Sequence, residues 1–126
     1  MSRIVISLLA VAVLGAGSAD AQGTTPPVLL LRLVKDTMRE TLHKPVYATF
    51  SRVFYIDQKT ENGGFPVCGF VAVKQTQVQH ANKQSFFGLL TPAEGDKPAS
   101  FGSIQIGGTP KQAEDIAATC KKYGVY

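Results

Sequence analysis

The feature that most constrains the fold is an apolar segment in the middle of the chain, residues 65–74, which reads FPVCGFVAVK. Its valines and glycine alternate with Cys68, Phe70 and Ala72, so both faces of an extended chain would be apolar. A strand of this kind is buried on both sides and lies centrally in its sheet. The sequence therefore predicts a central strand here, with Cys68 in the interior.

Two other segments have the apolar spacing of amphipathic helices. The first covers residues 28–43, with Thr25 as the expected cap and two prolines in its first turn. The second follows Thr109, the expected N-cap, with Pro110 in the first turn and Gln112 completing a capping box. The predicted inner faces are Leu31, Val34, Met38 and Leu42 in the first helix, and Ala113, Ile116, Ala117 and Cys120 in the second.

The remaining strands are predicted at residues 48–57, 85–92 and 101–106, which are rich in aromatic and β-branched residues. Strict alternation in the first of them predicts that Phe50 and Phe54 share one face, together with Arg52. Short loops between strands favour antiparallel pairing. The predicted fold class is α+β, with an N-terminal helix, an antiparallel sheet of about four strands and a C-terminal helix.

The beginning of the chain is typical of an export signal. Arg3 precedes an apolar run, residues 4–14, and residues 19–21, Ala-Asp-Ala, place small side chains where a signal peptidase cuts. The run is shorter than the roughly 20 residues that span a bilayer. We expect a periplasmic or secreted product that is organised as a signal peptide, residues 1–21, a flexible lead-in, residues 22–27, and a single domain, residues 28–126.

The only two cysteines of the chain are Cys68 and Cys120. An exported chain matures in an oxidising compartment, where two cysteines form a disulfide by default, and this bond would fix the last helix to the sheet. A pair of buried free thiols is the alternative. The closely spaced cysteines of a disulfide-exchange enzyme are missing. The two cysteines, His43 and His80 also lack the spacing of a zinc site, so no metal or other cofactor is predicted.

The charges and motifs indicate binding rather than catalysis. The chain has 13 Lys and Arg against 9 Asp and Glu, a net charge of +4, but the cations are scattered, unlike the basic face of a nucleic-acid-binding protein. Neither a phosphate-binding loop nor a nucleophile elbow is present, and no catalytic residue is predicted. We therefore expect a soluble, non-catalytic binding or accessory protein that has an envelope or secreted protein as its partner and no membrane segment after cleavage.

Two other functions stay open. The chain could inhibit or neutralise a hydrolase such as lysozyme, with the loop at residues 92–100 as the inserted segment, or it could be a small enzyme that acts on the cell wall. The candidate binding surface continues the central strand into a glutamine-rich stretch. It consists of Lys74, Gln75, Gln77, Gln79 and His80.

Two segments of the chain resemble a family of small exported bacterial proteins of uncharacterised function. The first, TLHKPVYATF, shares Leu42, Pro45, Ala48 and Phe50 with the family's Leu-x-Asp-Pro-x-Ala-x-Phe segment. The second, PVCGFVAVKQ, shares Val67, Cys68, Gly69, Val71 and Lys74 with its Val-Cys-Gly-x-Val-Asn-x-Lys-Asn strand. Lys44, Ala72 and Gln75 depart from these patterns, at an aspartate and two asparagines. The resemblance implies export, a single domain and a paired cysteine, and it implies no activity.

Overall fold

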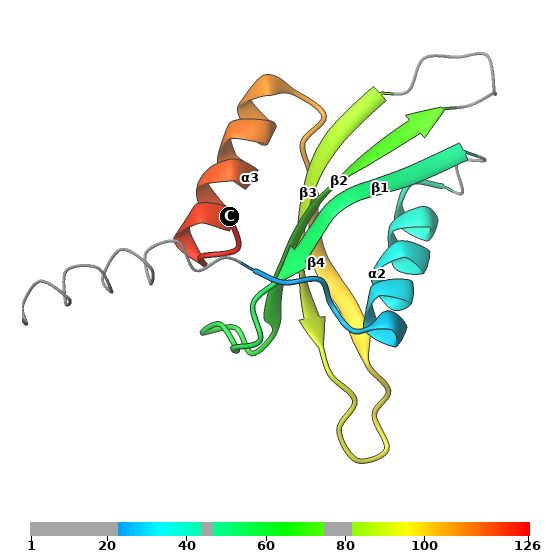
Figure 1. Ribbon diagram of the computed structural model, residues 1–126, viewed down its shortest axis with the longest axis vertical. Coiled ribbons are helices and arrows are strands. Elements are labelled where there is room, and N and C mark those ends of the chain that lie inside the picture. The colour runs from blue at the N-terminus through cyan, green and yellow to red at the C-terminus, as the bar shows by residue number, and fades with distance from the viewer. Residues whose placement is uncertain (1–22, 44–46, 75–81) are drawn as a thin grey trace, which may run out of the picture.

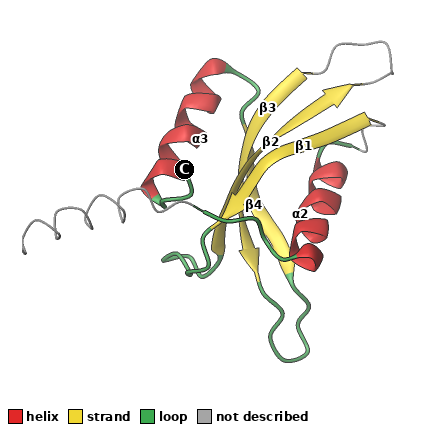
Figure 2. Cartoon of the chain, in the orientation of Figure 1, coloured by secondary structure: helices red, strands yellow, loops and turns green. Residues whose placement is uncertain are grey.

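The computed structural model describes residues 23–43, 47–74 and 82–126 (Figures 1 and 2). Its elements, in chain order, are α2 (Val28–Thr41), β1 (Tyr47–Tyr55), β2 (Phe65–Lys74), β3 (Asn82–Thr91), β4 (Ser100–Ile106) and α3 (Pro110–Lys122). The strands form one antiparallel sheet in the order β1-β2-β3-β4, and the two helices lie on opposite sides of it (Figure 1). The predicted α+β class and order of elements are confirmed.

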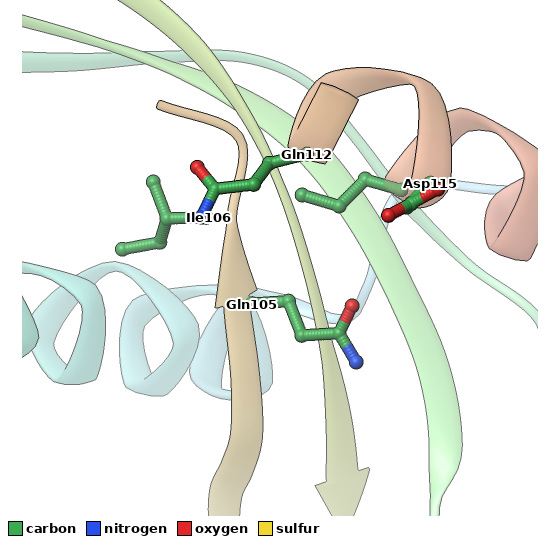
Figure 3. Close-up of a pocket in the computed structure, with 5 residues that line it drawn as sticks. Gln105, Ile106, Gln112 and Asp115 are labelled. Atoms are coloured by element: carbon green, nitrogen blue, oxygen red, sulfur yellow. The ribbon is translucent and has the colours of Figure 1, made fainter. Parts of the chain in front are cut away.

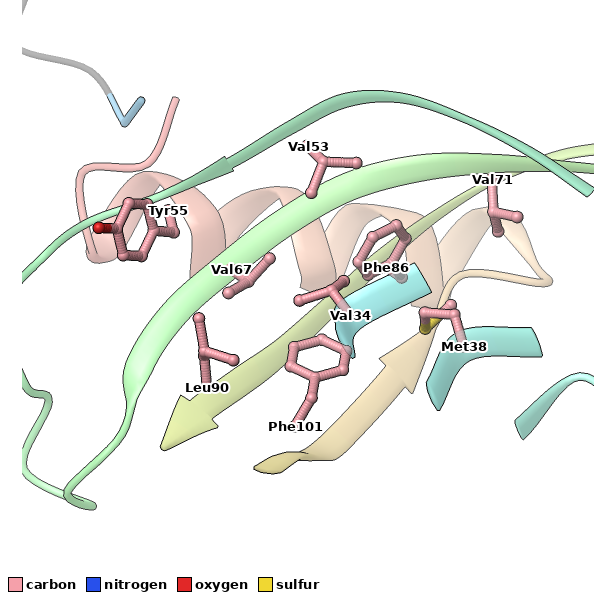
Figure 4. Close-up of a cluster of buried hydrophobic side chains, with 9 residues drawn as sticks. All are labelled: Val34, Met38, Val53, Tyr55, Val67, Val71, Phe86, Leu90 and Phe101. Atoms are coloured by element: carbon pink, nitrogen blue, oxygen red, sulfur yellow. The ribbon is translucent and has the colours of Figure 1, made fainter. Parts of the chain in front are cut away.

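The side of the sheet that faces α2 contains the larger hydrophobic core. Val34 and Met38 of the helix are fully buried, and they lie against Phe86 and Phe101 from the neighbouring strands (Figure 4). The predicted inner face of this helix is thus correct at its centre, while Leu31 and Leu42 are only partly buried at its ends. The rest of the buried cluster consists of Val53, Tyr55, Val67, Val71 and Leu90.

The side of the sheet that faces α3 contains a smaller core around the disulfide. Cys68, Phe87, Ile116, Cys120 and Val125 are buried there. The alternation predicted for the central strand is confirmed, because the valines of β2 contribute to one core and Cys68 to the other. Ala117 was predicted to face inward, but it is exposed, because Ile116 and Cys120 define a narrower stripe on the face of α3 that contacts β2, β3 and β4.

Both edge strands contain a β-bulge with a residue in the left-handed region. Arg52 has a φ of 51° and Ser103 a φ of 53°, at the points where the pairing registers of β1 and β4 shift. The strict alternation predicted for the first strand is therefore wrong. Phe50 packs in the α2-side core and Phe54 in the α3-side core, because the extra residue of a bulge reverses the faces beyond it.

The helix ends follow local rules with one exception. At α3, the Thr109 side chain accepts from the Gln112 amide and the Gln112 side chain accepts from the Thr109 amide, so the predicted capping box is confirmed. At α2, Pro27 occupies the N-cap position and no side chain caps the helix, so the prediction of Thr25 as the cap is wrong. Chain pairing near this end explains the difference, since Thr24 forms a bridge with Tyr55 of β1.

Candidate functional site

Two stacked aromatic rings lie between two cations on the α3 side of the sheet, beside the helix. The guanidinium carbon of Arg52 lies 5.3 Å from the ring centroid of Tyr126. The Tyr126 ring stacks with Phe70 of β2, with centroids 6.3 Å apart and planes at 20°. The Nζ atom of Lys83 on β3 lies 4.9 Å from the Phe70 centroid. We call these four residues, Arg52, Tyr126, Phe70 and Lys83, the cation–aromatic row.

Three different local features position the members of this row. The bulge in β1 brings Arg52 to the α3 side, where its guanidinium also lies 6.0 Å from the Phe54 ring. Ordinary strand alternation places Lys83 on the same side as Phe70, one pleat along the paired strands β2 and β3. Tyr126 lies beyond α3 and reaches β1 through its hydroxyl, which donates to the Arg52 carbonyl at 2.8 Å.

The disulfide lies on the same side of the sheet as the row, because Cys68 precedes Phe70 by two residues in β2. Cys68 and Cys120 are bonded, with their Cα atoms 6.2 Å apart and both side chains buried, so the predicted pairing of β2 with the last helix is confirmed. The chain then turns back at Gly124, whose φ is 77°, and the Val125 amide donates to the Cys120 carbonyl at 3.0 Å. The bond therefore anchors the turn that returns Tyr126 to the sheet.

The charge on the four strands is entirely positive. None of β1 to β4 contains an Asp or Glu, and their only charged residues are Arg52, Lys74 and Lys83. All three belong to the α3 side, Lys74 because it follows Phe70 by an even number of residues. Within the described residues, the ion pairs of the protein join other groups, namely Arg39 to Asp36, Lys111 to Asp115 and Lys122 to Glu61.

The rings are less exposed than the cations that lie over them. Arg52 and Lys83 are exposed, whereas Phe70 and Tyr126 are partly buried. Burial raises the pKa of the Tyr126 phenol, and the Arg52 charge opposes this rise. The phenol is therefore protonated at neutral pH.

Of the binding surface predicted from the sequence, only Lys74 lies within the described residues. Lys74 ends β2 on the side of the row, as just described, whereas Gln75, Gln77, Gln79 and His80 lie outside the described residues, so that extension stays a prediction. The row itself was missed. A strand-by-strand count of charges would have found the cations, but no local signal indicates that Tyr126 returns to the sheet.

A cavity of about 190 Å³ opens between β4 and α3 (Figure 3). Its lining residues are Gln105, Ile106, Gln112, Asp115 and Ile116. Two of its three polar lining side chains are already engaged, since Gln112 belongs to the capping box and Asp115 pairs with Lys111 at 3.2 Å. Asp115 is the one ionisable group in the lining of this cavity, and it is already paired with Lys111.

A second hollow, of about 210 Å³, follows the outer surface of α2 and is lined by Val28, Leu31, Arg32, Lys35, Asp36 and Arg39. Lys35 and Arg39 lie over the Phe50 ring, at 5.9 Å and 5.3 Å from its centroid. This arrangement resembles the cation–aromatic row, but it also contains a carboxylate. Asp36 pairs with Arg39 at 3.4 Å.

The chain matches no protein-family model, no curated protein and no solved structure. Over residues 23–43, 47–74 and 82–126, no three His, Cys, Asp or Glu side chains gather as metal ligands would. In the same part of the chain, neither α2 nor α3 combines the length and hydrophobicity of a bilayer-spanning helix.

Proposed function

We propose that this chain is a small exported protein of a bacterial envelope, periplasmic or secreted, and that it acts as a non-catalytic binding or accessory protein through the cation–aromatic row. The observation that carries the proposal is the row itself. It presents two exposed cations over partly buried rings, on strands that are packed on both sides and linked to α3 by a disulfide. Binding surfaces are most precise when rigid elements present them.

The chemistry of the row favours binding over proton transfer. An arginine guanidinium has five N–H donors and no acceptor, and the Tyr126 phenol, with its raised pKa, stays neutral at physiological pH. Such groups donate hydrogen bonds and offer ring surface, but they do not exchange protons near neutral pH, as a general acid or base must. Tyr and Arg are also enriched at the energetic centres of protein interfaces.

Export is tested by expressing the full chain in a bacterial host and measuring the intact mass of the released protein. The expected product begins at Gln22 and has both thiols oxidised. A product that retains residues 1–21, or that stays in the cytoplasm with free thiols, would contradict the proposal.

Binding is tested by affinity capture from envelope extract with the oxidised mature protein as bait. We expect one stoichiometric partner, which Phe70→Ala loses and Ile104→Ala retains. Ile104 is a matched control because it is also partly buried but packs against the α2-side core. Circular dichroism of both variants checks that they are folded. Turnover of a cell-wall substrate without a captured partner would instead identify an enzyme.

One observation favours inhibition of a hydrolase as a second candidate. The loop between β3 and β4 extends beyond the end of the sheet (Figure 1), and Glu94 and Lys97 close it with two backbone hydrogen bonds of 2.9 Å. A stiff projecting loop suits insertion into a cleft. It ranks second because Glu94 and Asp96 would be repelled by an acidic active site. A lysozyme assay with the intact chain and with a shortened loop tests it directly.

A further inference from the structure

We infer that the cation–aromatic row recognises an extended acidic segment of a partner polypeptide, with Arg52 and Lys83 each binding a carboxylate. The inference rests on the proposed function and specifies its partner. It follows from the order in which a ligand meets the groups of the row, from the sign of the charge around them, and from the separation of the two cations.

A ligand that approaches the row meets cations before rings. Arg52 and Lys83 are exposed and lie over Tyr126 and Phe70, which are partly buried. Proteins that stack nucleobases need open ring faces, and one face of each ring here is occupied by a cation. The guanidinium and ammonium donors are what remains available, and such donors bind anionic oxygens most strongly.

The surroundings of the row do not oppose an acidic ligand. Every carboxylate side chain in the described residues lies on a helix or in a loop, because the four strands carry none. Lys74 at the end of β2 belongs to the same side of the sheet and adds to the positive field. An anionic segment that crosses β1, β2 and β3 would therefore meet only cations from the sheet, and complementary charge of this kind gives specificity and fast association.

The spacing of the cations favours separate carboxylates over one phosphate. Arg52 and Lys83 arise from β1 and β3, which flank β2 and lie two strand spacings, roughly 10 Å, apart. Arg52 lies opposite β2 between Cys68 and Phe70, and Lys83 pairs with Ala72, so the two cations are also offset along the strands and lie roughly 12–14 Å apart. Phosphate sites gather several donors around one group, and anionic membranes attract clusters of about 4–8 cations. In an extended peptide, side chains two and four residues apart point the same way, roughly 7 and 13 Å from each other.

The test uses a labelled peptide, Glu-Thr-Val-Thr-Glu, with blocked ends, whose two carboxylates and central valine share one face when it is extended. Its binding to the oxidised protein is measured by fluorescence anisotropy, and NMR shifts locate the contact. We expect shifts at Phe70 and Tyr126 and at least about tenfold weaker binding by the Arg52→Gln/Lys83→Gln variant, as for the loss of a charge-assisted hydrogen bond. The Gln-Thr-Val-Thr-Gln peptide should bind as weakly.

A matched variant, Lys59→Gln/Lys97→Gln, removes the same charge from two exposed loop positions and should change the affinity less than about twofold, as expected of charges remote from the contact. An equal loss in both variants would show general attraction to a basic protein and overturn the inference. So would row-dependent binding of inorganic phosphate, anionic phospholipid vesicles or polygalacturonate without binding of the peptide.

The capture experiment separates the two proposals. If a captured partner depends on Phe70 but not on Arg52 and Lys83, the binding function stands and the acidic segment is refuted. If no partner is captured and the peptide does not bind, both proposals fall.

Discussion

Reduction of the disulfide is the perturbation whose effect the structure defines best. Cys68 and Cys120 are separated by 52 residues, and a loop of that length restricts the unfolded chain by about 4 kcal/mol in the chain-entropy model. After reduction the two thiols would remain buried as small apolar groups, so the folded state should lose little packing. The loss should therefore appear almost entirely as a gain in entropy of the unfolded chain.

The assay is urea unfolding of the oxidised and the reduced protein, followed by circular dichroism in the far ultraviolet and by fluorescence of the 4 tyrosines, since the chain has no tryptophan. We expect the free energy of unfolding to differ by about 4 kcal/mol, a large share of the roughly 5–15 kcal/mol typical of a domain. The unfolded oxidised chain should also be more compact, which lowers the m-value.

The control is a Cys68→Ala/Cys120→Ala variant, which should unfold at the same urea concentration with and without reductant. Oxidised and reduced wild type that differ by less than about 1 kcal/mol would refute the loop-entropy reasoning. If the control variant shows the same large difference with and without reductant, the reductant acts on something other than the disulfide.

Three further changes test individual contacts. Gly88→Ala should destabilise by about 1–3 kcal/mol in urea unfolding, because a Cβ there would lie 2.4 Å from a buried aromatic ring, whereas Gly102→Ala, with no atom within 4 Å, should be nearly neutral; equal effects would contradict the packing. Thr109→Ala should cost about 1 kcal/mol by the same assay, since it removes the side-chain cap of α3, and no loss would argue against the capping box. The pKa of Glu61 lies below its ordinary 4.5 because its own backbone amide and the Tyr123 hydroxyl donate to the carboxylate. The stabilisation that this gives is present above about pH 4.5 and is lost as the pH falls through the lowered pKa. NMR titration should show this pKa rising in Tyr123→Phe, and an unchanged value would exclude that hydrogen bond.

The sequence alone determined the elements of this protein and the pairing of its cysteines. Each of these signals acts over a few neighbouring positions, so the sequence contains the whole of it. They are the apolar spacing of α2 and α3, the β2 strand with two apolar faces, and the capping residues around Thr109. With only two cysteines, one pairing is available, and the predicted interior position of each made that pairing natural.

The tertiary structure decided how these elements combine. The bulges at Arg52 and Ser103 depend on the twist and pairing of whole strands. Neither residue is a glycine, which would have indicated a left-handed backbone position in the sequence. The inner stripe of α3 is narrower than predicted because contact with β2, β3 and β4 determines which of its residues are buried. The cation–aromatic row unites positions 52, 70, 83 and 126, which meet only after the sheet has paired and the last turn has folded back. Contacts between residues so far apart in the chain leave no periodic trace in the sequence, because each depends on where the others are placed.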